Sequence, residues 1–72
     1  MKTPKEKANE LMQENEDVLS KHIFNGYFDI AQELAINTVK QIMRYQPYEG
    51  NFHSPYAQQE YWNNVIAEIN AL

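Results

Sequence analysis

The chain contains no cysteine, which excludes disulfides and thiolate metal sites together. Histidine is nearly absent as well: His22 and His53 are the only two, and neither has a second histidine four residues away. Such a pair on one helix face is the usual sequence sign of a histidine metal site. The sequence therefore predicts neither a bound metal nor a cofactor.

Basic residues are also scarce. Arg44 is the only arginine, and six lysine and arginine residues against ten acidic ones give a formal net charge of −4. Because proteins that coat DNA or RNA need a basic face to displace counterions, that class is excluded. No run approaches the ~20 apolar residues of a membrane span, and the first residues lack the apolar core of a signal peptide. The expected location is the cytoplasm, or the host cytoplasm if the chain is phage-encoded.

Two glycines and three prolines mark the boundaries of the predicted helices. Thr3 and Glu6 have the spacing of a capping box, and Pro4 suits the first helical position. Apolar residues three and four positions apart then predict a helix over residues 4–24. We expect Gly26 to end this helix in the left-handed conformation.

A second helix is predicted over residues 28–45, because Pro47 disfavours helical geometry at the residue before it. Ser54, followed by a proline, has the pattern of a helix cap and predicts a third helix over 55–71. The positions expected to face the core are Ala8, Leu11, Met12, Asn15, Leu19, His22 and Ile23 in the first helix, Ile30, Ala31, Leu34, Ala35, Thr38, Val39, Ile42 and Met43 in the second, and Gln58, Tyr61, Trp62, Val65, Ile66, Ile69 and Leu72 in the third.

No alternating strand pattern and no internal repeat competes with these helices. The predicted fold is therefore all-α, a single small three-helix domain over residues 1–72. A chain of this length buries roughly 60% of its unfolded surface, and its core contributes only about 3–5 kcal/mol of net stability. Because disulfides and metals are excluded, self-association is the most economical further source of stability. We expect a homo-oligomeric helical bundle.

No residue pattern predicts catalysis. The four carboxylates of the first helix lie mostly on its polar side, which indicates a solvated face rather than an acid–base pair. These carboxylates are Glu10, Glu14, Glu16 and Asp17. Ser20 lies beside Lys21 and His22 only by local adjacency, and Ser54 is already explained as a cap. The chain is not expected to be an enzyme.

Aromatic residues are concentrated in the segment 45–62. Tyr61 and Trp62 fall on the apolar stripe of the third helix and are expected in the core. The aromatic residues between 45 and 56 differ, because connecting loops run over the surface. Beside two cations they suit stacking on a base and holding a phosphate, and they equally suit a subunit interface. The candidate ligand-binding residues are Lys40, Arg44, Tyr45, Tyr48, Phe52, His53 and Tyr56.

Three segments, TPKEKANELM, AQELAINTVKQI and YWNNVIAEINAL, resemble a family of small phage and prophage proteins of Bacteroidetes-type bacteria. Its members begin like TPKEKAKELV, continue like AKQCALIAVDEI and finish like YWQEVKQEIEKL. The last block is the most specific, and the residues on the family's positions there are Tyr61, Trp62, Val65, Glu68, Ile69 and Leu72. This chain departs from the family at Lys40 and Gln41, which replace an acidic pair.

The resemblance implies a phage setting rather than a mechanism. Small non-enzymatic phage proteins are often host-takeover or counter-defence factors. We therefore expect a binding protein, in the sharper form a counter-defence sponge that sequesters a cyclic nucleotide or related immune signal in an oligomer pocket. The alternative is an adaptor or inhibitor that docks on a host or phage protein through the aromatic loop 45–56. A purely structural helical module without a ligand is the third reading.

Overall fold

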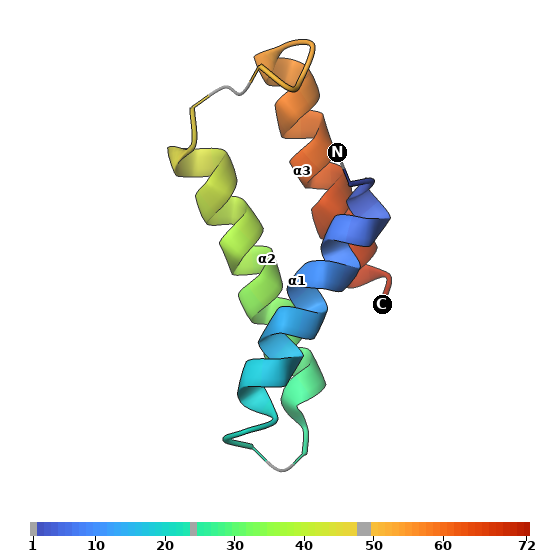
Figure 1. Cartoon of the computed structure of the whole chain (residues 1–72), viewed down its shortest axis with the longest axis vertical. Helices are drawn as coiled ribbons and strands as arrows, with labels where there is room; N and C mark the ends of the chain where they lie inside the picture. Colours follow the sequence, from blue (N-terminus) through green and yellow to red (C-terminus); the bar gives the residue numbers. More distant parts are fainter. Residues whose placement is uncertain (1, 24, 48–49) are drawn as a thin grey trace.

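The computed structural model describes residues 2–23, 25–47 and 50–72, which form three helices and no strand (Figure 1). These are α1 over Pro4–Leu19, α2 over Tyr27–Tyr45 and α3 over Pro55–Asn70. Within the described ranges the predicted all-α, three-helix fold is confirmed. Figure 1 shows an elongated bundle, 42 × 21 × 17 Å in extent, in which α1 packs against both other helices.

The start of α1 is closed by the predicted capping box. The amide of Thr3 donates to Oε1 of Glu6 at 3.0 Å, and the amide of Glu6 donates to Oγ1 of Thr3 at 3.2 Å. Pro4 is the first helical residue. The hydrogen bond from the Thr3 backbone holds the pKa of the Glu6 carboxyl below its ordinary value, since it favours the charged form. The exposed Glu6 therefore has a structural role.

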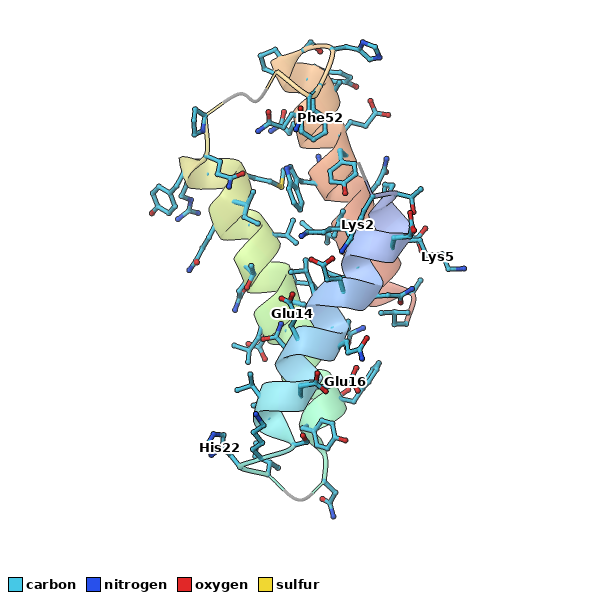
Figure 2. The ribbon with its side chains drawn as sticks, in the orientation of Figure 1. Lys2, Lys5, Glu14, Glu16, His22 and Phe52 are labelled. Carbon is cyan, nitrogen blue, oxygen red and sulfur yellow. The ribbon has the colours of Figure 1, made fainter. Side chains whose placement is uncertain are left out.

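α1 ends at Leu19, so its predicted continuation to residue 24 is wrong over the described residues. The amide of Ser20 makes the last helical bond, to the carbonyl of Glu16. The amides of His22 and Ile23 both donate to the carbonyl of Leu19, at 2.9 and 2.8 Å, and so close a turn. Figure 2 shows His22 pointing away from the bundle. Further helix would bury little apolar surface on that side, and helices in proteins depend on such burial.

Gly26 adopts the predicted left-handed conformation, with φ of 73°, but it precedes α2 instead of ending α1. α2 begins at Tyr27, one residue earlier than predicted, and ends at Tyr45 as predicted. Gln46 is extended, with φ −81° and ψ 135°, as expected for a residue before proline. The predicted bounds of the second helix are thus confirmed to within one residue.

α3 begins with the predicted cap. Oγ of Ser54 accepts a hydrogen bond from the amide of Ala57 at 3.1 Å, and Pro55 occupies the first turn. The helix ends at Asn70, one residue before the predicted end. Two long-range bonds then tie the helices together: Gln32 Nε2 donates to the Ile69 carbonyl at 2.8 Å, and the Tyr61 hydroxyl donates to the Lys2 carbonyl at 2.8 Å.

The core is narrow, and α2 contributes to it mainly small side chains. The buried apolar residues of the helices are Ala8, Leu11, Met12, Ala31, Ala35, Val39, Val65 and Ile69. Ile30 and Leu34, predicted to face this core, are instead 40% and 41% exposed. The alanines next to them in sequence face the core in their place. Because a helix packed through alanine approaches its neighbours closely, the larger residues lie at the edge of the contact.

The two isoleucines give a direct test of this arrangement. Ile69→Ala removes a side chain with no exposed surface, and we expect it to lower the free energy of unfolding by about 3 kcal/mol or to unfold the domain. Ile30→Ala makes the same chemical change at an exposed site and is the matched control, expected to cost about 1 kcal/mol or less. Urea denaturation of dilute protein, followed by circular dichroism, measures both. Equal losses would contradict the observed core.

Candidate functional site

Three of the predicted ligand-binding residues lie together on the last turns of α2. Lys40 and Arg44 are one turn apart, on the same side of the helix, and both are exposed. Tyr45 is 74% exposed, and the Cζ atom of Arg44 lies 6.0 Å from the centroid of its ring. That distance is at the outer limit of a cation–π contact. The end of α2 therefore presents two cations and one aromatic ring to solvent.

Phe52 has a packing role that its place in the loop did not reveal. Its side chain is only 9% exposed, and its ring centroid lies 5.4 Å from that of Tyr61. Tyr61 in turn makes an edge contact with Trp62, with centroids 5.0 Å apart. Figure 2 shows Phe52 directed from the loop back toward α3. The ring is thus taken up by contacts within the domain and holds the loop against α3.

The remaining predicted residues lie at the other end of the loop. His53 is exposed, and Tyr56, in the first turn of α3, is 74% exposed. Tyr48 lies outside the described residues. Figure 1 shows the end of α2 and the start of α3 standing apart at this end of the bundle. The exposed residues of the predicted site therefore form two groups, one at the end of α2 and one at the start of α3, whereas Phe52 packs on Tyr61.

A groove of about 220 Å³ separates the two helices at this end, and none of the predicted ligand-binding residues that the structure describes lines it. Its lining residues are Met43, Gln46, Pro55, Gln58, Gln59 and Trp62. Gln58 Nε2 donates to the carbonyl of Pro47 at 3.3 Å, which connects α3 to the residues that follow α2. Sequence reasoning assigned Trp62 and Gln58 to the core stripe. The sequence could not predict that both residues line this groove, because the groove depends on how the end of α2 is positioned relative to α3.

Burial around Tyr61 is the main electrostatic perturbation at this end of the bundle. Loss of solvation raises the pKa of the Tyr61 hydroxyl, with a smaller contribution from the negative charge of Glu6. The hydroxyl already donates to the Lys2 carbonyl, so its described role is to tie the start of the chain to α3. Nothing in this arrangement points to a proton-transfer role.

The acidic side of α1 is an open surface. Glu10 forms ion pairs with Lys2 and with Lys7, the latter at 2.9 Å, whereas Glu14 and Asp17 are exposed. Figure 2 shows Glu14 and Glu16 on different sides of α1. No three His, Asp or Glu side chains come close enough to hold a metal ion within residues 2–23, 25–47 and 50–72. This surface is consistent with the solvated face interpreted from the sequence.

Several large apolar side chains are exposed, and three of them, Ile30, Leu34 and Leu72, were assigned to the core from the sequence. Ile30 and Leu34 are one turn apart on α2, and Phe28, on the same helix, is 41% exposed. Val18 at the end of α1 is 57% exposed, and Leu72 is 48% exposed. Ile30 and Leu34, as neighbours on one side of α2, mark a candidate interaction surface. The signal in the sequence was the width of the apolar stripe of the second helix, which exceeds what a three-helix core can cover.

The two roles assigned to loop aromatics are separable by substitution. Phe52→Ala empties the space beside Tyr61, and we expect it to cost about 3 kcal/mol of unfolding free energy. Tyr56→Ala truncates an exposed ring and serves as the control, expected to change stability by about 0.5 kcal/mol or less. Thermal and urea denaturation measure both variants. A Phe52→Ala protein as stable as Tyr56→Ala would contradict the packing role.

None of the helices in the described part of the chain is both long enough and apolar enough to cross a membrane. No protein-family model, curated protein or solved structure matches this chain. The case for a function therefore depends on the surfaces described above.

Proposed function

We propose that this chain is a non-enzymatic binding protein that docks on another protein, as an adaptor or an inhibitor. The observation that carries the proposal is the pair of tyrosines at the two ends of the loop 45–56. Tyr45 and Tyr56 each expose 74% of their surface to solvent. Tyrosine and arginine are the residues most enriched among the anchors of protein interfaces, and Arg44 lies beside Tyr45.

The anchoring of the loop supports the same proposal. Phe52 packs on Tyr61, Gln58 bonds the Pro47 carbonyl, and Ser54 caps α3, so the described part of the connection is held at several points. A pre-ordered segment loses less conformational entropy on binding than a free one does. Residues that flank an anchored loop are therefore suited to recognition of a protein surface.

Charge favours a protein partner over a polyanion. Lys40 and Arg44 are the only cations on α2, whereas the chain as a whole has a net charge of −4. The groove beside them is lined by uncharged residues. A phosphate-rich ligand would therefore meet two cations on one side only and a repulsive field overall. A protein partner with apolar pockets and a few carboxylates matches this surface better.

The double variant Tyr45→Ala/Tyr56→Ala tests the proposal. Partners captured by the tagged protein in its host cell are purified, and their affinity for the protein is remeasured by calorimetry. We expect the double variant to weaken binding at least about tenfold, because buried interface tyrosines are common hot spots. Gln13→Ala, a truncation of an exposed residue on α1, is the control and should bind as the unmodified chain does. A reconstituted complex that tolerates the double variant would refute the proposed docking surface.

A second candidate function is the nucleotide sponge, in the phage setting that the sequence resemblance implies. It is supported by the position of Arg44 over the ring of Tyr45, with Lys40 one turn earlier. Arginine can hold a phosphate through two parallel hydrogen bonds, and an exposed ring can stack on a base for about 1–3 kcal/mol. The ligand would be a cyclic nucleotide or a related signal, bound intact.

Calorimetry with cyclic di- and trinucleotides and cyclic ADP-ribose isomers tests this second candidate. Binding is expected to fall at least about tenfold in Arg44→Gln, which keeps a polar side chain but loses the charge and the paired donors. Lys21→Gln removes one positive charge at the far end of the bundle and is the control. Chromatography of the recovered ligand checks that it was not cleaved. The absence of binding heat from every compound would rule out the sponge.

A further inference from the structure

The outward side of α2 carries a charge pattern that is divided between its two halves. Asp29 and Glu33 lie in the first half, and Lys40 and Arg44 lie in the second. All four side chains are exposed, and within the described ranges none of them has an ion-pair partner. The helix macrodipole favours this order of charges. It does not account for the exposed apolar residues beside them.

Those apolar residues belong to a stripe that runs the length of the helix. Ile30, Leu34, Thr38, Gln41 and Tyr45 follow one another at intervals of three or four residues, so they share one side of α2. All five are exposed. The stripe is apolar at one end, aromatic at the other and polar in the middle. Its charged neighbours follow the same spacing along the adjacent side of the helix.

The pattern becomes complementary to itself when a second copy of α2 is laid against it in the antiparallel direction. The midpoint between Ile30 and Tyr45 is also the midpoint between Leu34 and Gln41, and it falls between residues 37 and 38. A two-fold axis through that point places Ile30 of each chain opposite Tyr45 of the other. Such an interface is isologous, because the same patch serves both subunits.

The charges agree with this register. The midpoint between Asp29 and Arg44, and equally between Glu33 and Lys40, lies one residue from the axis defined by the apolar stripe. Each acidic residue is therefore offset from its basic partner by two residues, about 3 Å along the helix, which the long lysine and arginine side chains can span. Each acidic half would then face the basic half of the other chain. A parallel pairing would instead place like charges opposite each other, which is unfavourable.

The size and shape of the domain also favour a partner. Its accessible surface is 5125 Å², compared with about 4,700 Å² for a compact monomer of 8.5 kDa. Its radius of gyration is 13.0 Å, compared with about 11 Å for a compact chain of 72 residues. The isolated domain therefore leaves more surface in water than a compact monomer of the same mass does.

We infer that the outward side of α2 is a self-association surface, on which a second copy of this chain packs antiparallel about an axis between residues 37 and 38. This inference goes beyond the proposed function and is independent of it, although the two surfaces share Tyr45, so a second copy competes with another protein for that ring. The α2 strip is about 28 Å long and about 10 Å wide, or roughly 300 Å² per chain. That is less than half of a standard interface, so the dimer is weak and sensitive to salt.

A charge-swap experiment tests the inference with full-length protein. Asp29→Lys/Glu33→Lys makes both halves of α2 basic, and Lys40→Glu/Arg44→Glu makes both halves acidic. Sedimentation velocity, from micromolar to near-millimolar concentration at low salt, should find each variant monomeric, because like charges then face each other. Their equimolar mixture should form a heterodimer at least as stable as the dimer of the unmodified chain. Circular dichroism checks that both variants keep their helices.

The control is Glu14→Lys/Asp17→Lys on the exposed side of α1. It changes the net charge by the same amount as Asp29→Lys/Glu33→Lys and should leave the dimer intact. The inference is overturned if the unmodified chain stays monomeric throughout, if either swap variant dimerises as the unmodified chain does, or if their mixture stays monomeric. The test of the dimer uses charge-swap variants, whereas the test of docking uses Tyr45→Ala/Tyr56→Ala, so the two results are independent. Failure here therefore leaves the proposed docking on another protein standing, and failure of that docking leaves the dimer standing.

Because the chain has no cysteine, single cysteines report the register directly. In the antiparallel dimer, Ile30→Cys is expected to cross-link with Tyr45→Cys in a mixture of the two, and not with itself. Disulfides need Cα atoms within about 7 Å, whereas the two copies of residue 30 would be about 22 Å apart along the helix. Rapid self-linking of Ile30→Cys would contradict the antiparallel arrangement.

Discussion

The burial of small side chains on α2 is the constraint from which the rest of the structure follows. α2 meets its neighbours through Ala31, Ala35 and Val39, none of which retains exposed surface. Small side chains bring helix axes close together, and a short chain has no fourth helix with which to cover the flanks. The larger apolar residues of α2 are therefore left at the rim of the core. The surface available for association is a direct consequence of the way the core is built.

Because the three helices bury few large side chains, an aromatic residue of the loop is buried as well. Phe52 adds its ring to Tyr61 and Trp62 at the end of the bundle where α2 and α3 separate. Aromatic rings bury large areas and prefer tilted or edge contacts of this kind. The ring of Phe52 thereby ties the residues before α3 to the side of that helix. Tyr45 and Tyr56, on either side of it in the sequence, remain exposed.

The proposed partners of this chain share three residues at the end of α2, namely Lys40, Arg44 and Tyr45. The cations can hold the carboxylates of a second copy of α2 or the phosphates of a nucleotide, but not both at once. The exposed ring of Tyr45 can likewise cover Ile30 of a second chain or enter a pocket of another protein. Ligands that share residues are linked thermodynamically, so each one lowers the apparent affinity for the others. The end of α2 is therefore the region in which binding and self-association would regulate each other.

Most of the fold was predictable from the sequence, because helix boundaries depend on residues that are near one another in the chain. Thr3 with Glu6, and Ser54 with its following proline, act over three residues, and both caps were predicted correctly. The end of α1 was not predicted correctly. Whether the helix continues beyond Leu19 depends on how much apolar surface the neighbouring elements would bury there. The candidate site was predicted only in part. Sequence brought Lys40, Arg44 and Tyr45 together, but it placed Phe52 among the ligand-binding residues and Ile30 and Leu34 in the core.

The amino-acid sequence by itself determined that this protein is a small acidic bundle of three helices without cysteine, and it determined where most of those helices begin and end. Only the tertiary structure decided which side of α2 is buried and which loop aromatic is packed inside. The physical reason is that spacing at three and four residues defines a broad apolar side of a helix. The part of that side which becomes core is chosen by how closely, and in which direction, the neighbouring helices pass.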